Sequence, residues 1–187
     1  MQELNDYSGP LKDDLRLEDF SKEFIIKLAK EWQNRYPLQE ELWVEMIKDR
    51  FGQKEADELE MIFNTRMAEL SLPRMAKLAN IQVKDMVDVM KVFQLIVEGL
   101  MGFQPDSTYE IVNRNHVIWT VKRCLNLEYF EKVDPTRIVS FCQDKEERYL
   151  YIYTGVLLPD CEIKALKLPP RESREEIACQ WELKLKS

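Results

Sequence analysis

Closely spaced cysteine pairs are missing from this sequence, and histidine is nearly missing. The 187 residues include four cysteines and a single histidine, His116. Successive cysteines, at Cys124, Cys142, Cys161 and Cys179, are separated by 18 or 19 positions, so no CxxC pair occurs. Zinc ribbons and zinc fingers hold their metal with ligand pairs only a few residues apart. The cysteine spacing therefore excludes those frameworks.

Glycine and long apolar runs are also scarce, which narrows the classes of protein further. The chain has no P-loop, GxGxxG, GxSxG, HExxH or EF-hand pattern, and its five glycines do not favour a phosphate-binding loop, so we do not expect nucleotide chemistry by those routes. The most apolar segment, 83–101, is interrupted by charged residues, unlike the apolar run of about 18 residues that spans a membrane. The first twenty residues are polar and partly acidic, unlike a secretory signal. We expect a cytoplasmic protein with reduced thiols and no membrane partner.

Basic residues are outnumbered by acidic ones. The 27 Lys and Arg residues against 34 Asp and Glu residues give a net charge of −7. Binding along a phosphate backbone needs a basic surface, so we expect no nucleic-acid partner. Hydrophobic residues make up 45% of the chain, and a chain of this length buries a core without help from a metal or a disulfide.

Apolar residues recur at helical spacing through the first part of the chain, residues 1–104. We predict helices from Ser21 to Pro37, from Pro37 to Phe51, from Lys54 to Leu72, from Met75 to Ile81, and from Val83 through Val97 and Leu100 to Gly102. Pro37 and Pro73 set two of these boundaries because proline disrupts the helical hydrogen bonds that precede it.

The second part, residues 105–187, has the pattern of a sheet. A hairpin is predicted around 107–124, then a helix that begins at Asp134 and ends at Gly155, then strands at 161–168 and 177–187. This order predicts an α+β fold in which the helical region packs on a mainly antiparallel sheet of about four strands. We expect one compact domain, 17–187, and an inner position for the last strand, whose apolar and polar residues alternate.

A candidate site is predicted where the sheet meets the helix that begins at Asp134. Cys124, Cys142 and Cys179 would lie near one another there, as a nucleophile with partners or as soft ligands for zinc or iron. The hairpin pattern puts His116 and Cys124 on one strand face, so His116 is a further candidate ligand and the available imidazole base. Alternatively, the cysteines are small buried hydrophobic residues and His116 lies at the surface.

Four other residues are candidates for ligand binding. Trp119 and Trp181 could line a pocket from the sheet, although such residues more often form core. Tyr149 could direct its hydroxyl to a polar site, and Arg66 could bind a ligand carboxylate or stay solvated.

Two segments carry a resemblance to known families. "LNDYSGPLKDDLRLEDFSKE" and "LKLPPRESREEIACQWELKL" resemble the opening and closing sequences of a prokaryotic protein family of unknown function. More remotely, the last hundred residues are similar to the vinyl-reductase-like ligand-binding domain and the aminothiazoline-carboxylate hydrolase group. The resemblance implies an α+β fold, with Cys179 matching a cysteine on the last strand and Cys124 and Cys142 matching recurrent cysteines. Glu175 and Glu176 stand where the remote relatives carry glycine.

Three functions follow from these observations, and the sequence leaves open whether the protein is an enzyme. The first is a small-molecule-binding or metal-binding domain that uses the three cysteines. The second is a hydrolase of a small sulfur- or nitrogen-containing acid, with Cys142 or Cys179 as nucleophile and Arg66, Arg123 or Tyr149 binding the carboxylate. The third is an interaction module that forms a homodimer through its N-terminal helices.

Overall fold

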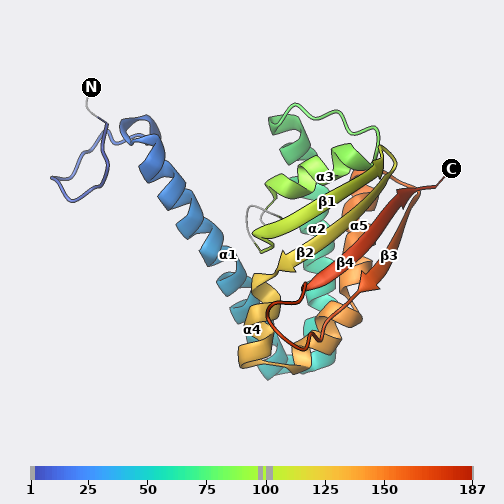
Figure 1. Cartoon of the computed structure of the whole chain (residues 1–187). Helices are drawn as coiled ribbons and strands as arrows, with labels where there is room; N and C mark the ends of the chain where they lie inside the picture. Colours follow the sequence, from blue (N-terminus) through green and yellow to red (C-terminus); the bar gives the residue numbers. More distant parts are fainter. Residues whose placement is uncertain (1–2, 97–98, 100–102, 187) are drawn as a thin grey trace. The chain divides into compact units, whose positions relative to one another are not determined.

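A computed structural model of the chain describes residues 3–96, 99 and 103–186 (Figure 1). The chain divides into two compact units, residues 1–42 and residues 43–187. Helices and a four-stranded antiparallel sheet make up the second unit, which confirms the predicted α+β fold.

The first helix, α1 (Lys22–Phe51), is longer than the sequence predicts. Ser21 caps it as expected, because its Oγ accepts a hydrogen bond from Phe24 N at 3.3 Å. The predicted boundary at Pro37 is wrong, since the helix continues through this residue. Proline removes one helical hydrogen bond, and the strong helix formers on both sides of it outweigh that local loss. The predicted end at Phe51 is confirmed, with Gly52 at φ 90° after it.

The second helix, α2 (Gln53–Leu78), also passes through a proline, Pro73. The sequence predicted a kink or a break near Leu72; a break, with a separate helix from Met75, is wrong. One face of α2 is buried at regular spacing, by Ala56, Glu60, Asn64, Ala68, Leu72 and Ala76. Because this face continues beyond Pro73 and packs on α5 (Glu146–Leu157), burial favours an unbroken helix there.

The third helix, α3 (Met86–Leu95), is shorter than the predicted segment. It begins where Asp85 accepts a hydrogen bond from Asp88 N at 3.1 Å. The predicted helical positions Val97 and Leu100 and the predicted end at Gly102 lie outside the described residues.

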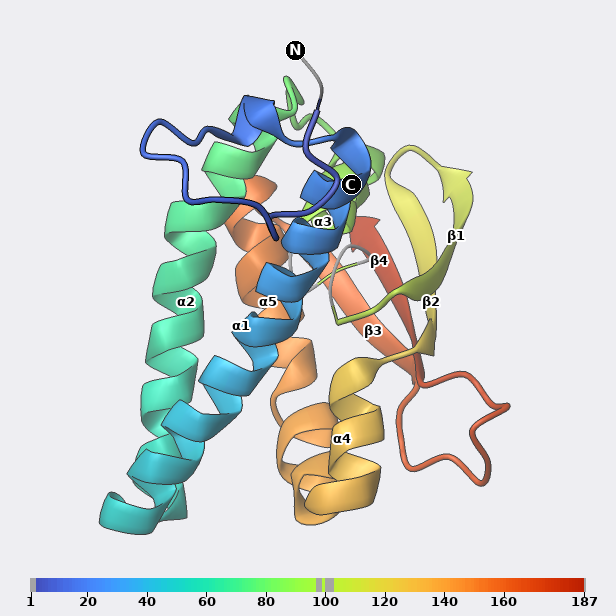
Figure 2. The same ribbon diagram turned by 90° about the vertical axis from the view of Figure 1, so that its left-hand side faces the viewer.

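The sheet has the strand order β1-β2-β4-β3, and all neighbours are antiparallel. Its strands are β1 (Asp106–Asn113), β2 (His116–Arg123), β3 (Cys161–Lys167) and β4 (Cys179–Leu185). The last strand therefore occupies an inner position, as its alternating pattern predicts. Helices α3 and α5 lie against one face of the sheet, and α2 packs behind α5 (Figures 1 and 2).

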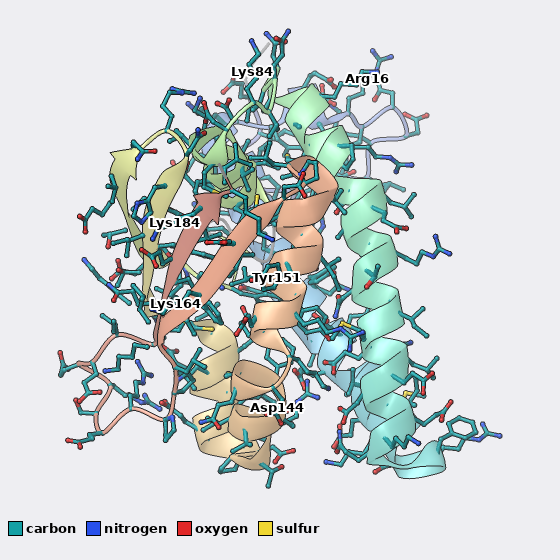
Figure 3. All side chains as sticks on the ribbon, turned by 90° about the vertical axis from the view of Figure 1, so that its right-hand side faces the viewer. Arg16, Lys84, Asp144, Tyr151, Lys164 and Lys184 are labelled. Atoms are coloured by element: carbon teal, nitrogen blue, oxygen red, sulfur yellow. The ribbon has the colours of Figure 1, made fainter. Side chains whose placement is uncertain are left out.

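The predicted helix from Asp134 to Gly155 is wrong in one respect, because it is not continuous. The short helix α4 (Leu125–Val133) is followed by a π-helix, η2 (Ile138–Gln143), and then by α5. Asp144 lies at the break between η2 and α5 (Figure 3). At the same break the ammonium group of Lys145 binds Asp57 and Glu60 of α2. These ion pairs attach the start of α5 to α2.

Candidate functional site

Three of the four cysteines come together at one end of the sheet. Cys124 follows β2 directly and precedes α4, Cys142 lies in the π-helix η2, and Cys179 is the first residue of β4. All three pack against the core, and both Cys124 and Cys142 are close enough to raise the pKa of Cys179. Three separate elements therefore supply one group of thiols.

Glu146, the first residue of α5, lies within electrostatic reach of all three thiols. The residue keeps partial contact with solvent, yet burial raises the pKa of its carboxyl to about 7. Among the described residues, none donates a hydrogen bond to this carboxyl or forms an ion pair with it. Near neutral pH the group is therefore poised between the acid and the carboxylate. We call Cys124, Cys142, Cys179 and Glu146 the thiol–carboxyl cluster.

Burial keeps the thiols of this cluster protonated. It raises the pKa of Cys124 to about 11, and it raises the pKa values of Cys142 and Cys179 well above the ordinary range. The nearby Glu146 carboxylate adds to the shift of each pKa because a second negative charge is unfavourable there. Nucleophilic attack and metal ligation both use the thiolate. At neutral pH the cluster thus presents neutral thiols.

The cations beside the cluster are already bound to carboxylates. Arg137, which lies near Cys142, donates from Nη2 to Glu60 Oε1 at 2.9 Å. Arg171, which lies near Cys124, binds Glu131 through two hydrogen bonds of 2.8 and 3.0 Å. Of the charged residues that the structure describes in the site, Glu146 is the one that is bound to no counter-ion.

Of the predicted ligand-binding residues on the core face of the sheet, Trp181 contacts the cluster, whereas the ring of Trp119 packs with those of Phe93 and Tyr109. The Trp181 Nε1 donates a hydrogen bond to Cys179 Sγ at 3.3 Å. Trp119 is paired with Trp181 across β2 and β4, and its buried Nε1 has no hydrogen-bond partner among the described residues. Tyr149 is buried one turn after Glu146 on α5, with its ring 5.5 Å from that of Phe141.

Other predicted residues lie elsewhere. His116 was expected on the strand face that carries Cys124, but Cys124 leaves the strand and turns toward the core. His116 stays on the opposite face of the sheet, where its Nε2 lies 3.0 Å from Glu182 Oε1. The structure therefore does not place His116 beside the cysteines. Arg66 is exposed on α2 and pairs with Glu69 at 3.0 Å, and Arg123 binds Glu128 at 2.7 Å.

The fourth cysteine, Cys161, begins β3 at the other end of the sheet, as its register opposite Leu185 shows. Burial raises the pKa of its thiol to about 11 as well. Within residues 3–96, 99 and 103–186, no group of three or more Cys, His, Asp or Glu side chains is arranged to hold a metal ion.

The sequence analysis did not identify Glu146, nor the buried charge network that Glu60 forms with Arg137 and Lys145. Glu60 is only 1% exposed and accepts hydrogen bonds from Arg137 and, at 2.8 Å, from Lys145. The Arg137 guanidinium also stacks on Phe130 and Phe141, at 5.3 and 5.5 Å from their ring centroids. A glutamate on the alanine-rich face of α2 is the one signal that could have indicated this network.

Comparisons with protein-family models, with curated proteins and with solved structures gave no match. In the described part of the chain, none of the helices has both the length and the apolar character needed to span a membrane.

Proposed function

We propose that residues 43–187 form a small-molecule-binding domain whose site is the thiol–carboxyl cluster. The observation that carries this proposal is Glu146, a largely desolvated carboxyl to which no residue in the described part of the chain binds as a cation or hydrogen-bond donor. A carboxyl in such surroundings lowers stability whenever it ionises, so it has no structural purpose of its own. Perturbed and unpaired groups of this kind concentrate at functional sites.

The backbone beside Glu146 supports the same proposal. Cys142 lies in a π-helix, a rare conformation that occurs frequently at functional sites. Trp181, whose Nε1 donates to Cys179 Sγ at 3.3 Å, links the cluster to the core face of the sheet.

The charges around the cluster indicate the chemistry of the ligand. Arg137 and Arg171 are held by Glu60 and Glu131, so the cations near the cluster are not free to bind a ligand anion. Glu146 favours a ligand with a positively charged or hydrogen-bond-donating nitrogen. We therefore expect amines or amidines to bind rather than carboxylates.

Benzamidine and benzoate provide a matched pair of probes, because they have similar shapes and opposite charges. Calorimetric titration should give saturable binding of benzamidine that strengthens from pH 6 to pH 8, as Glu146 ionises, and no binding of benzoate. Glu146→Gln should abolish benzamidine binding, whereas Glu147→Gln, at the exposed neighbouring position, should leave it unchanged. Equal binding to both variants, or a preference for benzoate, would refute the proposal.

A hydrolase is the second candidate, and a different property of Glu146 favours it. A carboxyl whose pKa is about 7 is well suited to act as a general base at neutral pH. The protonated thiols make Cys142 and Cys179 poor nucleophiles, so Glu146 would activate water instead. The sequence resemblance suggests 2-aminothiazoline-4-carboxylate as the substrate to test. Hydrolysis detected by mass spectrometry, lost in Glu146→Gln and kept in Cys142→Ser, would support this candidate.

A further inference from the structure

The two outer strands of the sheet differ in how their free edges are protected. β3 carries three charged residues among seven, Glu162, Lys164 and Lys167. The Tyr151 hydroxyl of α5 also caps this edge, because it donates to Ile163 O at 3.1 Å and accepts from Ile163 N at 3.2 Å. Tyr151 and Lys164 lie on neighbouring elements in Figure 3. Charged residues and bound side chains are the usual means of preventing edge-to-edge pairing.

The edge of β1 is less protected: its two charged residues are Asp106 and Glu110, its pairing with β2 is irregular only at the two ends of the strand, and no described side chain caps the edge between Ser107 and Ile111. In the part of the chain that the structure describes, β2 is the one strand that pairs with β1. The uncharged segments Ser107–Tyr109 and Ile111–Asn113 flank a single acidic residue, Glu110. Ile111 and Val112 are exposed by 58% and 50%. An exposed edge with apolar side chains is a surface that pairs readily with another strand.

The register of the sheet identifies which backbone groups of β1 point outward. Leu185 N donates to Asn115 O at 2.9 Å, so the odd-numbered residues of β2 direct their N–H and C=O groups toward β4. The even-numbered residues of β2 then bond to Thr108 and Glu110 of β1. The N–H and C=O groups of Ser107, Tyr109 and Ile111 consequently face the free edge.

We infer that this free edge pairs with the same edge of a second copy of the chain, antiparallel and centred on Tyr109, to give one continuous sheet across the dimer. A two-fold axis perpendicular to the sheet places Tyr109 opposite the partner's Tyr109 and Ser107 opposite the partner's Ile111. Every outward-facing group named above then finds a partner.

The charges of β1 are compatible with this register and disfavour its neighbours. Glu110 lies opposite the partner's Thr108, and Asp106 lies opposite the partner's Val112. The neighbouring registers with the same hydrogen-bonding pattern are shifted by two residues. A shift in one direction places Glu110 opposite the partner's Glu110, and a shift in the other direction places it opposite the partner's Asp106. Like charges directly opposite are destabilising across a strand pair. The strand is thus complementary to itself in the centred register.

Two isoleucine-to-lysine variants test the inference by sedimentation equilibrium. Ile111→Lys adds a charge to the β1 edge, and Ile62→Lys makes the same change at a similarly exposed site (53%) on α2. The unmodified protein and Ile62→Lys should sediment as dimers at micromolar concentration, and Ile111→Lys should sediment as a monomer with unchanged circular dichroism. If Ile111→Lys does not fold, Ser107→Pro replaces it, since proline there removes an outward N–H and the Ser107 Oγ bond to Gln104 O but no hydrogen bond between β1 and β2.

A monomeric unmodified protein would overturn the inference, as would a dimer that survives Ile111→Lys or Ser107→Pro. A dimer that is lost in Ile62→Lys and kept in Ile111→Lys would assign the contact to the helices instead. The benzamidine titration does not depend on any of these results, so the proposed ligand site and the proposed edge contact can fail separately.

Discussion

Replacement of Glu146 by glutamine should stabilise the protein at high pH and have little effect at low pH. The carboxyl has a pKa of about 7 in the folded protein, against 4.5 for an exposed glutamate. It therefore binds its proton more tightly in the folded state than in the unfolded state, by about 3 kcal/mol. This contribution to the free energy of unfolding is fully present below pH 4.5 and is lost as the pH rises through 7. Glutamine stays neutral throughout.

The measurement is thermal unfolding of Glu146→Gln and of the unmodified protein between pH 5 and pH 8. The difference in Tm between the two proteins should grow by roughly 5–10 °C across this range, because about 1 kcal/mol shifts Tm by a few degrees in a chain of this size. Other titrating groups cancel in the difference. Glu147→Gln, at an exposed position, serves as the control and should show no such growth. A difference that stays constant with pH would refute the argument that Glu146 lies desolvated and unpaired.

Three further predictions concern the cysteines and the charge network. Cys124 should react with a disulfide reagent at pH 8 about 100-fold more slowly than an exposed cysteine, because its raised pKa reduces the thiolate by that factor; a thiol of the cluster that reacts as fast as free cysteine would contradict this. Glu60→Ala removes the buried carboxylate that Arg137 and Lys145 share, and should lower the free energy of unfolding by about 3–5 kcal/mol in urea titrations. The exposed Glu58→Ala should change it by about 0.5 kcal/mol or less. If the cluster binds zinc or iron as the sequence also suggests, natively purified protein should contain stoichiometric metal that Cys142→Ser loses, and metal-free protein would end that proposal.

Local sequence patterns predicted the sheet better than the helices. The alternation of Trp181 and Leu183 with polar neighbours correctly indicated an inner strand, because a strand's pleat repeats every two residues whatever surrounds it. Pro37 and Pro73 were read as helix boundaries, and both lie inside helices. The cost of a proline is local, whereas the buried face of α2 extends on both sides of it. Packing of that kind is not visible in a short window of sequence.

The candidate site was predictable only in part, for a related reason. The sequence predicts the proximity of Cys124, Cys142 and Cys179 because each of them lies in or next to a strand or helix of the predicted sheet layer. Glu146 lies in "DKEER", which reads as a solvated charge run, and its raised pKa depends on atoms from several elements. His116 illustrates the opposite error. Alternation along β2 predicts that Cys124 shares the strand face of His116, but β2 ends before Cys124, which turns toward the core.

The central place of β4 has a consequence for the order in which the sheet assembles. The β1–β2 hairpin closes over a short turn, but β2 and β3 are joined only when β4 inserts between them. The pairing of His116 with Lys184 encloses α4, η2, α5 and β3 in one long loop. Closing such a loop is entropically costly and slow. Because Cys179 is the first residue of β4, the thiol–carboxyl cluster can be completed only when this strand inserts.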